Sequence, residues 1–346
     1  MILFLEDGLV CIESILSLPL MRVFSGIQPT GKVHLGNYVG AIHNWIQIQS
    51  NKHPKLKLSH PKDSITMVAD LHSLTIHPNH TNTLETTAAL LSFGLDADSL
   101  LFRQSKVPDH TRLAWILACR TPIEWLRKMI QWKEKGKLTR ESGLLMYPVL
   151  QSADILLYRA QFVPVGYDQC QHIELAREIA RRFNNSVGAD VLLKPEPILN
   201  SCSKIYSLSN ADSKMSKSGD EMSALNISDT KEEISLKIKK AKTDSIKGIQ
   251  YDPSNRKEIS NLVQIFAIAT GQSCESIADE YSGKEITEFK NDLTESFISF
   301  WNPFQLEYMK LIREKEFLLQ VLEKNEEKAR LVASETMKIV DSLLGL

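Results

Sequence analysis

The sequence predicts an α/β fold, in which a parallel β-sheet covered by helices is followed by an all-helical region. From Met21 onward, short apolar runs alternate with longer stretches of helical periodicity, which is typical of a parallel sheet with helical crossovers. From about residue 229 the strand signals vanish, and helical periodicity continues to the C-terminus. With 346 residues, 43% of them hydrophobic, the chain can bury the cores of two domains, and we place the boundary near residue 225.

Four apolar runs are the candidate strands of this sheet, in chain order residues 22–27, 64–70, 100–104 and 162–166. After the first run, Gly31 and Gly36 open a helix that continues through Trp45. The second run ends in polar residues, at the strand end where parallel sheets usually carry their chemistry. Pro164 in the fourth run argues against an ordinary central strand, because proline has no backbone N–H to donate.

Helices are expected in most of the remaining chain. Residues 109–159 form a long helical region, with interruptions predicted at Pro122, Gly143 and Pro148. Residues 305–344 have the pattern of one or two amphipathic helices. The lysine-rich stretch 231–242 is most often a solvated helix face, but it is also the best candidate for contact with a nucleic-acid backbone.

Composition excludes several classes of protein. The net charge of −1 provides no global attraction to nucleic acid, so any RNA contact must depend on a local basic patch. Five cysteines are scattered without a C-x-x-C pair, which argues against a zinc site or a disulfide framework and suits a reducing compartment. No apolar run approaches the roughly 20 residues that a membrane span requires, so we expect no membrane association.

Residues 1–20 form an N-terminal extension that fits no standard targeting signal. The segment is apolar, yet it carries Glu6, Asp7 and Glu13 and has no lysine or arginine. A secretory signal needs a positive start, and a mitochondrial presequence is usually rich in arginine and poor in acidic residues. We therefore leave this segment out of the fold prediction.

The turn after the first strand has the size of a nucleotide-binding turn. Gly26 and Gly31 lead into a helix that starts with His34 and Asn37, but neither a G-x-G-x-x-G pattern nor a P-loop is present. Such a turn would allow the backbone and the imidazole to approach phosphates. Alone, it is more readily explained as a helix N-cap with a surface histidine.

A second segment, residues 214–218, has lysines on both sides of Met215 and Ser216. A flexible loop of this kind can close over a triphosphate in the transition state, although alone it is more readily a solvated linker. Together, the two segments provide what an enzyme needs to hold ATP while an acid attacks its α-phosphate.

Polar residues between these segments indicate an amino-acid pocket. Tyr147, Gln151 and Asp154 lie on one face of a predicted helix. An unpaired buried carboxylate is costly, so Asp154 needs either an internal arginine or tyrosine or a ligand N–H, such as an indole or an ammonium group. Asp168 and Gln169 open the helix after the fourth strand, where they can cap it or bind ribose hydroxyls and an ammonium group.

These segments resemble the tryptophanyl-tRNA synthetases, a family of class I aminoacyl-tRNA synthetases. The resemblance runs from Met21 essentially to the C-terminus and rests on residues 24–31, 34–37, 154–158, 163–166, 168–169 and His172. Asn37 at the last position of the class signature is usual for the tryptophan branch. Gln151 stands where many bacterial relatives carry methionine, and at this position the chain resembles the mitochondrial members of the family. Two departures are Tyr167, where an acidic residue is usual, and the pair Gly219 and Asp220 after the lysine loop.

The resemblance implies a role for each matched residue. Asp154 would accept the indole N–H in a slot formed by Phe24, Gly26, Val163 and Val165, while Tyr147, Gln151 and Gln169, with His72 nearby, would hold the ammonium or carboxylate. The implied ATP site comprises Gln28, Thr30, His34, Gly36, Asn37, Gly166, Asp168, Lys214, Met215, Ser216, Lys217 and Ser218. The implied catalytic groups, which contact ATP and its phosphates, are His34, Asn37, Lys135, Lys214 and Lys217.

The family reaction would be ATP-dependent ligation of L-tryptophan to tRNA(Trp) through a tryptophanyl-adenylate, with release of AMP and pyrophosphate. The resemblance implies a Rossmann-like catalytic domain over residues 21–225 and a helical anticodon-binding domain over residues 226–346. It further implies a homodimer, and Mg²⁺ that arrives with ATP and has no dedicated protein ligands. We expect a mitochondrial-matrix enzyme, with the cytoplasm as the alternative.

Two other functions remain open. A tyrosyl-tRNA synthetase shares both ATP segments and differs in its amino-acid pocket. A non-catalytic paralogue that acts as an RNA-binding or regulatory module would be expected to lose His34 or the phosphate lysines, and this sequence keeps them.

Overall fold

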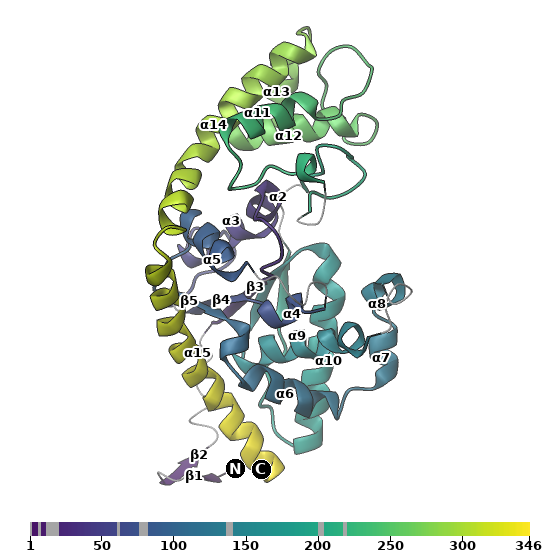
Figure 1. The fold of residues 1–346 in the computed structure, drawn as a ribbon. Helices are drawn as coiled ribbons and strands as arrows, with labels where there is room; N and C mark the ends of the chain where they lie inside the picture. The colour runs from purple at the N-terminus through teal and green to yellow at the C-terminus, as the bar shows by residue number, and fades with distance from the viewer. Residues whose placement is uncertain are drawn as a thin grey trace.

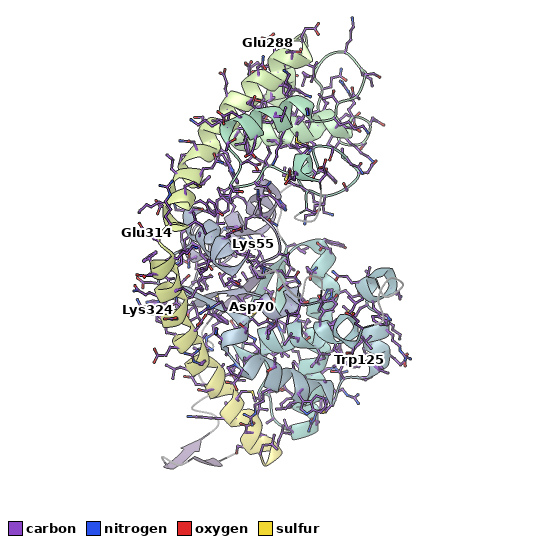
Figure 2. All side chains as sticks on the ribbon, in the orientation of Figure 1. Lys55, Asp70, Trp125, Glu288, Glu314 and Lys324 are labelled. Carbon is purple, nitrogen blue, oxygen red and sulfur yellow. The ribbon has the colours of Figure 1, made fainter. Side chains whose placement is uncertain are left out.

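The computed structural model describes residues 2–5, 8–11, 21–60, 63–75, 82–135, 141–199, 204–216 and 220–346. A central sheet is flanked by helices, and α14 and α15 form a long column along one side of the molecule (Figure 1). Side chains cover this column along its length, including Glu288, Glu314 and Lys324 (Figure 2). Among the described helices, none is both long enough and apolar enough to cross a membrane.

The central sheet has five parallel strands in the order β5-β4-β3-β6-β7. The strands are β3 (Val23–Ile27), β4 (Ser64–Val68), β5 (Leu100–Arg103), β6 (Phe162–Val165) and β7 (Glu196–Leu199). All four predicted strands are confirmed, and β7 was not predicted, because a proline and a glutamate interrupt its short apolar run. The chain order reverses at β3, and α/β sheets of this kind bind ligands at the carboxyl end of such a switch point.

Pro164 lies in an interior strand, and the pairing around β6 explains why it is tolerated. Phe162 donates its backbone N–H to Arg22 O at 3.2 Å, and the β3–β6 ladder contains only the pair Val23 and Phe162. Two residues later the backbone nitrogen of Pro164 points to the same side, where β3 no longer pairs with β6. The missing N–H therefore interrupts no ladder, and the two strands diverge toward their carboxyl ends.

The helix predicted after β3 is confirmed. It consists of α2 (Leu35–Asn37), the π-helical turn η1 (Tyr38–Ile42) and α3 (His43–Gln49). The next elements in the chain are α4 (Asp70–Ser73), α5 (Thr83–Ser92) and η3 (Gln104–Lys106).

Residues 109–159 are helical as predicted, but two of the three expected interruptions are absent. The elements are α6 (Asp109–Ala118), α7 (Ile123–Arg127), α8 (Ile130–Lys135) and α9 (Ser142–Leu157). Pro122 lies in the break between α6 and α7 as expected, at the N-cap of α7, whereas Gly143 and Pro148 both lie within α9. Pro148 is buried where α9 packs between α6 and α10 (Cys170–Val187), and this packing offsets the lost helical hydrogen bond.

From residue 220 onward the regular elements of the described chain are all helical, as predicted. After η5 (Glu221–Ser223) they are α11 (Lys231–Lys240), α12 (Lys257–Thr270), α13 (Cys274–Tyr281), α14 (Ile286–Leu311) and α15 (Lys315–Leu344). Residues 305–344 thus contain parts of two helices. The last one returns to the sheet: Arg103 at the end of β5 forms a partly buried ion pair with Glu326, and Ala329, Ala333 and Met337 join the core that contains Phe102. The domain boundary near residue 225 stays a prediction.

The N-terminal extension contains two short strands, β1 (Ile2–Leu5) and β2 (Gly8–Cys11), which pair antiparallel. The sequence analysis predicted no structure for this segment.

Candidate active site

The carboxyl ends of β3 and β6 open into a cavity of about 350 Å³. Its walls come from segments far apart in the sequence, namely the turn after β3, α4, α9, the start of η4 (Tyr167–Gln169) and the lysine loop. The predicted site residues that line it are Phe24, Gly26, Gln28, Gly36, Asn37, His72, Tyr147, Gln151, Asp154, Val163, Val165, Gly166, Asp168, Gln169 and Lys214.

The turn after β3 is held in a tight conformation. Gly31 has φ +65°, a left-handed conformation that favours glycine. Asn37 Oδ1 accepts from the backbone N–H of His34 at 3.2 Å, and this bond caps the start of α2. Asn37 therefore supports the helix and lines the cavity, whereas His34 is buried behind Gly36 and Thr30 lies outside the cavity walls.

This turn and the segment that follows the lysine loop are hydrogen-bonded to each other. Leu35 N donates to Leu225 O at 2.8 Å, and Ile227 N donates to Val33 O at 2.9 Å. A Cβ on Gly36 would lie 3.0 Å from His34 Nδ1 and 3.3 Å from Met215 Cβ. Only glycine fits there without a shift of its neighbours, so the two segments that suggested ATP binding are in direct contact.

The lysine loop has a hairpin-like base. Tyr206 pairs with Lys214 as an antiparallel bridge, and Met215 N donates to Ile205 O at 3.1 Å. Asn261 of α12 holds this base, because its Oδ1 accepts from Tyr206 N at 2.9 Å and its Nδ2 donates to Tyr206 O at 3.0 Å.

Lys214 is exposed at the cavity, Met215 is buried against Gly36, and Ser216 is exposed outside the cavity walls. Three predictions fall on parts outside the described residues: Lys217, Ser218 and the side chain of Lys135. The departure at Gly219 also lies there.

The carboxylate of Asp154 is buried and is hydrogen-bonded to three side chains. His72 Nε2 lies 2.7 Å from Oδ2, His110 Nδ1 lies 2.7 Å from Oδ1, and Gln104 Nε2 donates to both oxygens at 2.9 and 3.0 Å. Burial raises the pKa of Asp154, but the charge of His72 and the hydrogen bonds from the two histidines outweigh it and lower the pKa to about 2. The carboxylate is therefore ionised at neutral pH and acts only as an acceptor.

Gln104 and His110 were missed in the sequence analysis, which considered an internal arginine or tyrosine as the partner of Asp154. Both residues are fully buried, and His110 Nε2 also lies 2.9 Å from the Tyr158 hydroxyl. Gln104 is the last residue of the predicted third strand, and a polar residue at that end of a parallel strand was the available signal.

The hydroxyl of Tyr147 joins a second polar group. It donates to Gln131 Oε1 at 2.8 Å and lies 2.8 Å from His172 Nε2. Burial raises the pKa of Tyr147 to about 12, and burial lowers the pKa of His172 to about 4. Both side chains are therefore neutral near pH 7, and His172 donates its Nε2–H to the Tyr147 oxygen. Gln131, which also lines the cavity, is a site residue that was not predicted from the sequence.

Beside Gln151, two side-chain amides and one carboxylate are linked by hydrogen bonds along the cavity wall. Gln151 Nε2 donates to Gln169 Oε1 at 3.5 Å, and Gln169 Nε2 donates to Asp168 Oδ2 at 3.2 Å. A Cβ on Gly166 would lie 2.6 Å from Asp168 Oδ1, so this carboxylate occupies space that only a glycine leaves open. The opposite wall is apolar and includes Phe24, whose ring stacks on that of Tyr158 at a centroid distance of 5.7 Å.

The described part of the chain contains no group of three or more histidine, cysteine, aspartate or glutamate side chains arranged to hold a metal ion. Asp70, near the middle of the molecule (Figure 2), accepts from Ser105 N at 2.9 Å and so joins the start of α4 to η3, which follows β5.

Comparison with known proteins gives consistent matches. Residues 19–302 match the family described as "tRNA synthetases class I (W and Y)". The chain is 41% identical over 333 residues to a tryptophan–tRNA ligase of Rickettsia conorii, covering 93% of this chain and 98% of the relative. It is 39% identical over 347 residues to a chloroplastic/mitochondrial tryptophan–tRNA ligase of Arabidopsis thaliana, covering 94% and 82%.

Among solved structures, the tryptophanyl-tRNA synthetase of Campylobacter jejuni complexed with ADP and tryptophan superposes with a TM-score of 0.80. The two sequences are 30% identical, and the match covers 94% of this chain and all of the other, 100%.

Proposed function

The chain belongs to the class I tRNA synthetases for tryptophan and tyrosine, and from this premise we propose how its residues perform the reaction. The reaction is the ATP-dependent ligation of L-tryptophan to its tRNA. It proceeds in two steps: the tryptophan carboxylate attacks the α-phosphorus of ATP, and the tryptophanyl group then passes from the adenylate to the terminal ribose.

The assignment of the amino-acid pocket rests on the ionised Asp154 at the cavity wall. An indole N–H is a pure donor and a carboxylate is a pure acceptor, so the pair is complementary. Apolar residues on the facing wall, including Phe24 and Val163, would enclose the ring. Tryptophan then meets Asp154 beside His72, the one of its three partners that itself lines the cavity.

The amino-acid backbone would bind on the other side of the cavity. Tyr147, Gln151 and Gln169 supply hydroxyl and amide oxygens for the ammonium group, and the two amides supply N–H donors for the carboxylate. This places the attacking carboxylate toward Gly36 and Lys214, where the α-phosphate of ATP would lie.

The nucleotide would bind between the turn after β3 and the start of η4. Gln28, Gly36 and Asn37 would contact the phosphates, while Gly166 and Asp168 would contact the ribose. Lys214, with Lys135 and Lys217, would neutralise the leaving pyrophosphate. Mg²⁺ would enter as part of the Mg·ATP substrate. The reaction needs no covalent enzyme nucleophile, because positioning and charge neutralisation suffice.

Amino-acid-dependent exchange of pyrophosphate into ATP tests this proposal. We expect exchange with tryptophan and none above background with tyrosine at the same concentration. Exchange with tyrosine alone would favour the tyrosyl enzyme. No exchange with either amino acid would favour the non-catalytic alternative.

We propose that the protein forms a homodimer through an apolar surface beside the active site. A second cavity of about 390 Å³ shares His72 and Tyr147 with the first and is otherwise mostly apolar. Its rim includes Leu74, 50% exposed, and Trp115, 71% exposed. Large exposed apolar side chains that gather in one place usually mark an interaction surface. Sedimentation of the wild type and of Trp115→Glu tests this: a monomeric wild type, or an unaltered dimer in the variant, would contradict it.

For the remaining partners and the compartment, we propose that residues 226–346 bind the tRNA anticodon and that the protein works in the mitochondrial matrix. Lys239 and Lys240, near the end of α11, supply positive charge within residues 226–346. The name of the Arabidopsis relative includes both chloroplasts and mitochondria, which supports the mitochondrial location. Charging of mitochondrial against cytosolic tRNA(Trp), with imaging of the full chain, distinguishes the matrix from the cytoplasm.

A further inference from the structure

Gln104 connects the carboxylate of Asp154 to the beginning of α4. The residue directly follows β5 and has no exposed surface. Its Oε1 accepts from the backbone N–H groups of Leu71 at 3.1 Å and His72 at 3.4 Å. Its Nε2 donates to both oxygens of Asp154, at 2.9 and 3.0 Å. One amide plane therefore holds the backbone that carries His72 and the carboxylate that His72 contacts.

The three partners of Asp154 restrain it in different ways. His72 contacts only Oδ2, and His110 contacts only Oδ1. Of the three partners, Gln104 alone contacts both oxygens and links the carboxylate to the backbone of α4.

We propose that Gln104 is a positioning residue that determines selection for an indole N–H. This inference rests on the proposed function, in which Asp154 accepts that N–H. Gln104 holds the carboxylate in one orientation, so that an acceptor position beside His72 faces the cavity. Gln104 and His110 lie behind Asp154 and do not line the cavity, so neither touches the substrate.

The physical reason is that selection depends on what happens when the N–H is missing. A fixed site that must hydrogen-bond a substrate N–H strongly rejects an analogue without it, because the buried acceptor then lacks its donor. A carboxylate that can turn accepts a hydrogen bond from water instead, and the rejection weakens. Loss of Gln104 should therefore reduce selectivity as well as activity.

The experiment compares L-tryptophan with 3-benzothienyl-L-alanine, in which sulfur replaces the indole N–H. The measured quantity is the ratio of kcat/KM for the two amino acids in pyrophosphate exchange. Gln104→Met keeps the side-chain length and removes both hydrogen-bonding groups. We expect the ratio to fall at least tenfold, because activity with tryptophan is lost while the low activity with the analogue changes little.

Two further variants separate positioning from folding. Gln104→Glu keeps the length and an acceptor for α4 but replaces the donor to Asp154 with a second carboxylate, and we expect the same loss of selectivity. Gln49→Met is the matched control: Gln49 is also buried, and its Oε1 accepts from Asp96 N at 2.9 Å, away from the cavity. We expect this variant to keep the wild-type ratio.

The possible outcomes are distinct. A wild-type ratio well above one that is preserved in both Gln104 variants, with equal losses for both amino acids, would overturn the inference and leave the proposed function standing. A wild-type ratio near one would overturn the role of Asp154 and the inference with it. If Gln104→Met does not fold, the ratio of Gln104→Glu decides.

Discussion

Gly36 lies directly against Met215, so the turn after β3 and the lysine loop share one packed contact. A Cβ at Gly36 would meet Met215 Cβ at 3.3 Å and the imidazole of His34 at 3.0 Å. In Gly36→Ala the imidazole of His34 and the lysine loop at Met215 must therefore shift by a few tenths of an ångström. We expect the rate of pyrophosphate exchange to fall by roughly tenfold or more, because displacements near 1 Å cost up to about a hundredfold.

Titration of ATP in the exchange assay measures this effect. The control is Gly283→Ala, since a Cβ at that position meets no atom within 4 Å. An unchanged rate in Gly36→Ala would show that the two segments are not mechanically coupled.

Asp154→Ala is predicted to abolish most tryptophan-dependent exchange. The variant removes the acceptor for the indole N–H and leaves three buried donors without a partner. We expect a loss of about 3 kcal/mol or more in kcat/KM, which is over a hundredfold. Asp154→Asn, which keeps one acceptor oxygen, should lose less. Thermal melts accompany the kinetics, and near-wild-type exchange in a folded Asp154→Ala protein would exclude Asp154 as the indole partner.

Asn261 is predicted to affect the rate rather than tryptophan binding. Its amide makes both hydrogen bonds that hold Tyr206 at the base of the lysine loop. In Asn261→Ala the base is released, so kcat for exchange should fall by about tenfold while KM for tryptophan stays constant. Lys257→Ala on the same helix is the control: it removes an exposed ion pair with Asp212, which contributes little. Equal effects of the two variants would argue against a specific role of Asn261.

Acid destabilisation is predicted to involve His172. Burial lowers its pKa in the folded protein to about 4, below the ordinary 6.5. The unfolded chain therefore takes up a proton near pH 6.5 that the folded protein resists until about pH 4. Stability from this residue is fully present above pH 6.5 and declines as pH falls to 4, by about 3 kcal/mol.

Denaturant unfolding between pH 7 and 4 measures this decline, with His172→Gln as the comparison. In the variant, the slope of the unfolding free energy against pH should correspond to about one proton fewer taken up on unfolding. The same slope in both proteins would assign the acid sensitivity to other groups.

Much of the fold follows from local patterns. Apolar runs identified four of the five strands, and helical periodicity identified the region after residue 225. Packing outweighs local preference at Pro148, which lies inside α9, whereas Pro164 lies in an interior strand where its missing N–H interrupts no ladder. The strand β7 lacks a distinct local pattern, because Glu196 and Pro197 interrupt it.

The sequence by itself determined the helix face that carries Asp154, the helix start that carries Gly166 and Asp168, and the loop that carries Lys214, and it thereby identified these residues as site candidates. Only the tertiary structure decided which residues from distant segments contact them. Gln104 follows β5 and His110 lies in α6, and they reach Asp154 on α9 only after the sheet has formed and these helices have packed. The contact of Gly36 with Met215, and that of α15 with β5, depend likewise on closure of the whole chain. Periodicity reports neighbours within a few residues, whereas these contacts are set by burial of apolar surface between distant segments.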